Sequence, residues 1–245
     1  MTVNWLQADW PAPDFIKAGT TLRQGGVSTG VYSGFNLATH VGDELAAVEE
    51  NRAILTRSLN APDAPQWLEQ IHSSKAVLLP NEETIPKADA SYTSKENVVC
   101  SVMTADCLPL LITNKQGSCV ASIHAGWRGL CDGIIEATIK KLPTEPETLL
   151  VWLGPAISAD VYEVGEEVYD AFIHDDNKAK QAFTSVSEGH WLFDIYHLAR
   201  YRLNTMGIKQ IYGGDRCTLS EEEQFFSYRR DNVTGRMASI IWIEK

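Results

Sequence analysis

Three residues with metal-binding side chains, and one carboxylate beside them, fall at the ends of expected strands. The stretch VMTADCLPLLI places Asp106 and Cys107 between two apolar runs, and His72 and His124 each follow another apolar run. Two imidazoles and a thiolate suit Zn²⁺ in a site that keeps a fourth position open for water. The same donors also suit copper. We therefore expect a metal site of His72, Cys107 and His124, with zinc as the expected metal and copper as the alternative.

The same residues also allow chemistry without a metal. Cys107 can act as a nucleophile with a histidine as its base, and with Asp106 or an amide as the group that orients the base. Cys107 can also be a buried core thiol, although Asp106 and Pro109 nearby argue against simple core filling. No HExxH or CxxC spacing decides between these readings. We keep His72, Cys107, His124 and Asp106 as candidate catalytic residues.

Five further polar residues are candidates for binding a substrate. Arginine offers planar donors for an anionic oxygen, and histidine and asparagine offer hydrogen bonds. The candidates are Arg23, Asn36, His40, Arg128 and Arg229. The helix expected to begin after the motif HAGW adds free N–H groups that favour an anion.

A glycine-rich turn, QGGVSTG, follows Arg23. It lacks the GxGxxG and GxxxxGK[ST] spacings of phosphate-binding loops. We interpret it as a tight turn that needs positive φ, because glycine is the default residue there.

Apolar patterning predicts the elements that position these residues. The expected helices are Glu44–Leu59, Leu130–Leu142, Val164–Ile173 and Asp194–Met206. The expected strands are Thr20–Arg23, Gln66–Ile71, Ala76–Leu79, Val98–Met103, Leu108–Thr113, Cys119–Ile123, Thr148–Leu153, Gln210–Tyr212, Phe225–Arg230 and Ala238–Ile243. The turn NKQG joins two of these strands in a β-hairpin. Because strands and helices mix without a regular βαβ rhythm, we expect one α+β domain over residues 1–245, with mixed sheets covered by helices.

Composition excludes several classes of partner. The chain of 245 residues is 44% hydrophobic and 22% charged, with a formal net charge of −11. An acidic chain gains nothing from counterion release, which argues against nucleic acid. The sequence contains no apolar run of the roughly 18 residues that a membrane span needs. The first residues lack the pattern of a signal peptide, and five cysteines without CxxC spacing fit a reducing compartment, so we expect a cytoplasmic protein.

Several motifs together resemble a known family. QIHS, VMTADCLPLLI, HAGWRGL, WLGPAI, GGDRCT and FFSYRRD occur in this order and are similar to those of the laccase-domain family, also called the multicopper polyphenol oxidase-like or peptidoglycan-editing-factor family. The resemblance covers nearly the whole chain. It implies an α+β fold related to bacterial toxin cysteine hydrolases. It also implies that His72, Cys107 and His124 hold zinc.

The resemblance implies a purine nucleoside phosphorylase that uses adenosine, inosine and S-methyl-5′-thioadenosine, with adenosine deaminase activity. Purine nucleoside and phosphate are then the expected partners. One alternative is a cysteine- or metal-dependent hydrolase that edits UDP-muramyl amino-acid precursors of peptidoglycan. Another is a copper-dependent polyphenol oxidase. Six histidines without an HxH pair are too few for a multicopper centre. Zinc lowers the pKa of a bound water to about 7, which suits deamination, whereas phosphorolysis needs a phosphate site, for which Arg23, Arg128 and Arg229 are the candidates.

Overall fold

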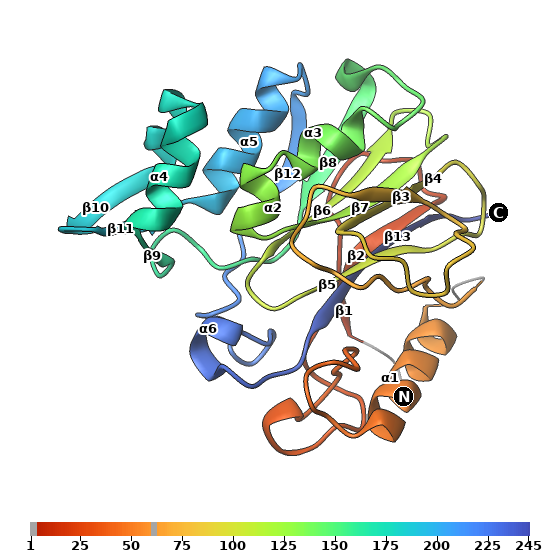
Figure 1. Cartoon of the computed structure of the whole chain (residues 1–245). Coiled ribbons are helices and arrows are strands. Elements are labelled where there is room, and N and C mark those ends of the chain that lie inside the picture. The colour runs from red at the N-terminus through yellow and green to blue at the C-terminus, as the bar shows by residue number, and fades with distance from the viewer. Residues whose placement is uncertain (1–3, 60–62) are drawn as a thin grey trace.

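Two β-sheets lie face to face, and helices cover both outer faces (Figure 1). A computed structural model describes residues 4–59 and 63–245 of the expected domain 1–245. Within this part, no helix is long and apolar enough to cross a membrane.

The larger sheet has six strands. In spatial order they are β12 (Gln210–Gly213), β8 (Leu149–Leu153), β6 (Leu108–Asn114), β7 (Val120–Ala125), β4 (Ala90–Thr93) and β3 (Ala76–Leu78). The two outermost pairings are parallel and the three central ones antiparallel. The central strands β6, β7 and β8 are buried along their whole length, which explains their almost continuous apolar sequences.

The smaller sheet has four antiparallel strands in the order β1 (Trp5–Gln7), β2 (Ile16–Thr21), β13 (Met237–Ile243) and β5 (Cys100–Thr104). Side chains alternate across this sheet. Val102 packs between the two sheets, and its neighbour Met103 packs on the opposite face, together with Ile54 and Leu55 of helix α1 (Leu45–Ser58).

The outer face of the larger sheet is covered by α2 (Trp127–Cys131), α3 (Ile134–Ile139) and α5 (Ile195–Thr205) (Figure 1). Helix α4 (Glu166–Asp175) extends this core over a third sheet, with strand order β10 (Phe183–Ser187), β11 (His190–Phe193) and β9 (Glu163–Gly165). The remaining elements are α6 (Tyr228–Asp231) and the 3₁₀ turns Gly30–Tyr32, Pro146–Thr148 and Asn177–Ala182.

The α+β class with mixed sheets is confirmed, as is the hairpin of β6 and β7. The glycine turn also has the expected positive φ, at Gly25 (86°), Gly26 (72°) and Gly30 (61°).

Three expected elements are wrong. The helix expected at Leu130–Leu142 is interrupted at Gly133, whose φ of 81° ends α2 before α3 begins. The segment expected as strand Gln66–Ile71 is irregular apart from one isolated bridge at Glu69. Where a strand was expected at Phe225–Arg230, two buried phenylalanines lead into α6, which Ser227 caps by accepting a hydrogen bond from the Arg230 N–H.

Candidate metal centre and active-site cleft

The residues Ala105–Cys107 carry the chain from one sheet to the other. Strand β5 belongs to the four-stranded sheet and β6 to the six-stranded sheet, and β6 begins directly after Cys107. Asp106 takes a φ of 91°, which is unusual for a residue other than glycine. The motif ADC is therefore the sharp turn that joins the two layers.

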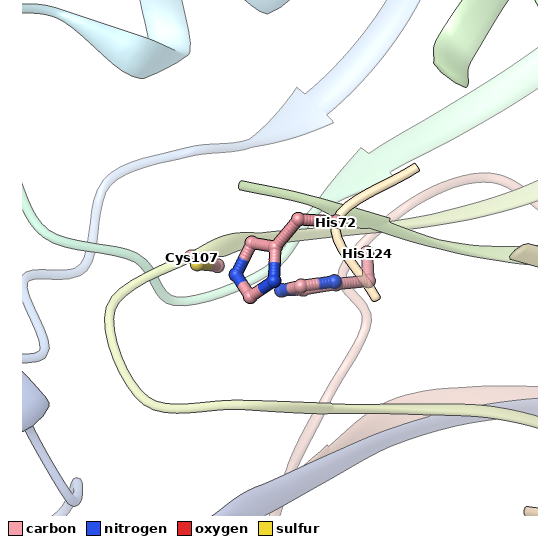
Figure 2. Close-up of side chains that lie close together, drawn as sticks. All are labelled: His72, Cys107 and His124. Atoms are coloured by element: carbon pink, nitrogen blue, oxygen red, sulfur yellow. The ribbon is translucent and has the colours of Figure 1, made fainter. Parts of the chain in front are cut away.

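Three segments bring the expected ligands together at this turn. His124 lies on β7 opposite Pro109 of β6, which places it beside Cys107. His72 lies in the loop before β3, with a φ of 59°. The donor atoms of the three side chains lie within 4.8 Å of one another. Figure 2 shows the side chains pointing toward one another. The two imidazole rings make an interplanar angle of 74°.

Asp89 holds both histidines in place. Its carboxylate is fully buried and accepts a hydrogen bond from Nδ1 of His124 at 2.8 Å. It also accepts from the backbone N–H groups of His72 at 2.9 Å and of Ser73 at 2.6 Å. This carboxylate turns Nε2 of His124 toward the other donors and holds the left-handed backbone of His72. Sequence reasoning missed Asp89, although a charged residue between alanines at the start of a strand was a usable signal.

The site has room for a metal ion because residue 126 is glycine. A Cβ atom there would lie 2.8 Å from Cδ2 of His72 and 3.1 Å from Sγ of Cys107. Zinc bonds of about 2.0 to 2.3 Å in tetrahedral geometry place donor atoms roughly 3.3 to 3.7 Å apart. Donors already within 4.8 Å need only a small contraction to reach that geometry. The donor set and the space it encloses therefore fit zinc.

The environment favours the thiolate form of Cys107, which is the form that binds metals. Burial alone raises the pKa of this thiol, but the positive charge of His124 and hydrogen bonds from His124 and His72 outweigh burial and lower the pKa to about 6. For His124, burial lowers the pKa, while the Cys107 charge and the hydrogen bond to Asp89 raise it to about 9.

Asp106 binds groups outside the metal centre. Its carboxylate accepts hydrogen bonds from the Thr218 hydroxyl at 2.6 Å and from the Arg229 backbone N–H at 2.6 Å. The carboxylate is thus bound to residues that follow β12, and it fixes the turn that carries Cys107. This arrangement fits a positioning role for Asp106.

A cleft of about 470 Å³ opens onto the three ligands. His40 lines it, as expected, which places His40 beside the metal centre. The other lining residues include Met103, Ala105 and Tyr228, which supply apolar surface, and Gln70, Thr104 and Arg236, which supply polar groups. Sequence reasoning did not name these six residues as site residues, although five of them lie within the motifs QIHS, VMTADCLPLLI and FFSYRRD.

The structure places the other candidates outside this cleft. Arg23 lines a separate cleft with Glu222 and Glu223. Asn36 is fully buried, and its amide donates to Asp43 Oδ2 at 2.9 Å, so it holds its own loop.

Arg128 and Arg229 are exposed. Burial and the charge of Cys107 raise the pKa of the nearby Tyr162 phenol, whereas the charges of the two arginines lower it. Arg229 donates to the carbonyl oxygen of Glu163 at 2.7 Å. Helix α2, which follows Gly126, has only five residues and so supplies little of the expected helix dipole.

A family model described as multi-copper polyphenol oxidoreductase laccase matches residues 17–244. The chain belongs to this family. A relative named purine nucleoside phosphorylase, from Haemophilus influenzae, is 49% identical and covers 98% of this chain and 99% of its own length. The purine nucleoside phosphorylase YfiH of Escherichia coli K12 is 51% identical over 96% of each chain. The crystal structure of protein NMB0706 from Neisseria meningitidis superimposes with a TM-score of 0.94 at 46% identity, covering 99% of this chain and 100% of that one.

The family's copper name contrasts with the donors present. Among residues 4–59 and 63–245, His72, Cys107 and His124 form the one group of three or more potential metal-binding side chains. A multicopper centre needs several such groups close together. This laccase-family chain therefore has the ligands for a single metal ion in its described part.

Proposed function

We propose that the protein is a zinc-dependent purine nucleoside phosphorylase that uses adenosine, inosine and S-methyl-5′-thioadenosine, and that also deaminates adenosine. The convergence of His72, Cys107 and His124 beside a cleft is the observation that supports this proposal most directly. The names of the relatives from Haemophilus influenzae and Escherichia coli support the reaction class.

In phosphorolysis, the bond between the base nitrogen and C1′ of the sugar breaks, a phosphate oxygen bonds to C1′, and the base leaves with a proton. His72, Cys107 and His124 would hold a zinc ion, which would supply a Lewis acid at this site. The apolar side chains of Met103, Ala105 and Tyr228 offer a surface for the flat base. Of the candidate substrate-binding residues, His40 lines this cleft, whereas Arg128 and Arg229 lie outside it.

The test is release of free base by purified, zinc-loaded protein. Adenine from adenosine and hypoxanthine from inosine should appear only when phosphate is present, together with ribose 1-phosphate. Conversion of adenosine to inosine measures the deaminase activity separately and needs no phosphate. Cys107→Ala should lose bound zinc and both activities together, because the thiolate is a ligand. Base release that is independent of phosphate, or undiminished in Cys107→Ala, would refute the proposal.

One feature favours a second candidate, a cysteine-dependent hydrolase that acts on UDP-muramyl amino-acid precursors. Asp89 orients His124, and His124 forms a hydrogen bond with Cys107. In a cysteine hydrolase these three residues would serve as orienting group, base and nucleophile, respectively. This hydrolase would keep its activity after chelation and lose it after thiol alkylation. The zinc enzyme would lose activity in both treatments, so chelation alone separates the two candidates.

A further inference from the structure

Arg236 brings a positive charge into the cleft, where Cys107 and Asp106 act on it electrostatically without forming an ion pair among the described residues. Its Nη1 donates to the backbone oxygens of Thr234 at 2.8 Å and Gly235 at 3.0 Å. Across the described residues, no carboxylate lies within ion-pair distance of it. Its guanidinium lies 5.7 Å from the ring centroid of Tyr228, which also lines the cleft. A half-buried arginine bound only to carbonyl oxygens keeps donors available for an anion.

Thr104 supplies a second unsatisfied group in the same cleft. Its side chain is 1% exposed, and its hydroxyl has no hydrogen-bond partner in the described part of the chain. Buried hydroxyls are nearly always hydrogen-bonded, and leaving one unpaired costs about 1 to 3 kcal/mol. A bound ligand that accepts or donates a hydrogen bond there removes this penalty. Thr104 therefore points to a polar ligand rather than to packing alone.

His40 completes the polar side of the cleft. Burial lowers its pKa, and the positive charges of Arg236 and Arg52 lower it further. A neutral imidazole can still donate one N–H. None of the residues that line the cleft is an aspartate or glutamate. The Cys107 thiolate is the acidic group that lines the cleft, and a metal ion bound to it would offset its charge.

We propose that His40, Thr104 and Arg236 form a subsite for a tetrahedral oxyanion, and that inorganic phosphate occupies it. This inference rests on the proposed phosphorylase function, because it assigns the place of one of the two substrates. Thr104 ends β5 just before the turn that carries Cys107, so an anion bound there lies next to the metal centre. The phosphate then shares the cleft with the three metal ligands, so its oxygen can reach the sugar carbon of a nucleoside bound in the same cleft.

The exposed arginines are the rival location. Arg229 is bound to the Glu163 carbonyl and lies 5.3 Å from the Tyr162 ring centroid, and Arg128 lies 4.3 Å from the centroid of its neighbour Trp127. Both are solvated, so a phosphate held there keeps much of its contact with water. Arg236 is less exposed to solvent than Arg128 and Arg229. Charge-assisted hydrogen bonds to a phosphate are therefore stronger at Arg236.

The first experiment measures binding of inorganic phosphate to zinc-loaded protein by equilibrium dialysis with labelled phosphate. Arg236→Gln should weaken binding about 10- to 100-fold, because it removes a charge-assisted donor. Arg236→Lys keeps the charge but loses the planar pair of guanidinium donors, so it should weaken phosphate binding less than Arg236→Gln does. Arg57→Gln is the matched control: it removes the same charge from an exposed pair on α1 and should leave phosphate binding unchanged. Weakening by Arg128→Gln with no effect of Arg236→Gln would overturn the proposal.

The second variant separates ligand binding from folding. Thr104→Val keeps the shape of the side chain and removes a hydroxyl that has no partner in the free protein, so thermal stability should stay the same or rise. Phosphate affinity should fall about 3- to 10-fold, as expected for one hydrogen bond. A lower melting temperature with unchanged phosphate affinity would show that Thr104 is structural and would contradict the subsite.

The same measurements distinguish this inference from the proposed reaction. If phosphate binds and depends on Arg236 while no base is released, the subsite stands and the phosphorylase reaction falls. If base is released and Arg236→Gln leaves the KM for phosphate unchanged, the reaction stands and the subsite falls. When both are correct, Arg236→Gln and Thr104→Val raise the KM for phosphate much more than the KM for inosine.

Discussion

Gly126 keeps open the space that the metal ligands need. Its φ of −67° and ψ of 162° suit any residue, so its backbone does not require glycine. The requirement comes from the neighbours: an added Cβ would lie closer to His72 than carbon atoms normally approach. The contact therefore acts on the metal ligands and leaves the backbone fold unaffected.

Gly126→Ala should weaken zinc binding about 10- to 100-fold, the usual effect of disturbing the groups that orient metal ligands. Competition with a zinc-chelating dye measures this affinity. Gly189→Ala is the control, because a Cβ there meets no atom within 4 Å, and it should keep the normal zinc affinity. Normal zinc affinity in Gly126→Ala would contradict the proposed ligand set.

The ligands themselves could be proposed from residue types and motifs, whereas the groups around them could not. The fold brings three further residues to the site, where the chain crosses from one sheet to the other: Asp89, Thr104 and Arg236. Nothing in their local sequence indicates that crossing. The opposite error occurs at Asn36, which has the chemistry of a substrate-binding residue but uses its amide to hold its own loop.

At the scale of elements, helix α1 anchors the glycine-rich loop that precedes it. Asn51 is fully buried on α1, and its side-chain oxygen accepts from the Val27 N–H at 2.8 Å. Its amide donates to the Ser28 hydroxyl at 3.0 Å and to the Asn36 carbonyl at 2.9 Å. A single side chain thus satisfies three groups of this loop, in addition to the two backbone hydrogen bonds that Ser28 and Gly34 exchange.

Asn51→Ala should lower the free energy of unfolding by about 2 to 4 kcal/mol, because several buried groups lose their partner at once. Urea unfolding followed by tryptophan fluorescence measures the change. The control is Glu50→Ala on the exposed side of the same helix, where only a surface pair with Arg57 is lost, and the change should stay within about 0.5 kcal/mol. A loss below about 1 kcal/mol in Asn51→Ala would show that α1 does not anchor the loop.

Periodicity predicted elements where one face is continuously buried. It succeeded for the hairpin of β6 and β7 and for helix α5. It failed where a single residue overrides the pattern, as at Gly133, whose positive φ breaks an otherwise regular helical repeat. It also failed at the strand expected at Gln66–Ile71. There the Gln70 side chain forms hydrogen bonds with the backbone N–H and carbonyl of Met103, groups that a neighbouring strand would otherwise pair with. Each of the short strands β9, β10 and β11 has a single buried residue and leaves no such pattern.

At the scale of the whole molecule, a bound metal joins parts of the chain that are far apart in sequence. His72 comes from the loop before β3, Cys107 from the crossing between the sheets, and His124 from β7. An unfolded chain cannot hold all three in one geometry. Metal binding is therefore coupled to folding.

Zinc at a free concentration of about 100 times its Kd should stabilise the protein by roughly 2.7 kcal/mol, the value expected for a ligand that binds only the folded state. Thermal unfolding with added zinc and with a chelator measures the shift. His72→Ala should fold normally, because this side chain is exposed, and should lose most of the zinc-dependent shift. An equal shift in His72→Ala would place the stabilising metal elsewhere.

The three ligands differ in their exposure: His124 is buried, Cys107 is intermediate and His72 is exposed. The two inner donors sit on or beside the strands β6 and β7, and the outer donor belongs to a loop whose conformation Asp89 maintains. A metal ion held by these three side chains would therefore enter and leave past His72. The rate at which a chelator removes it would be set by excursions of this loop, without opening of the two sheets.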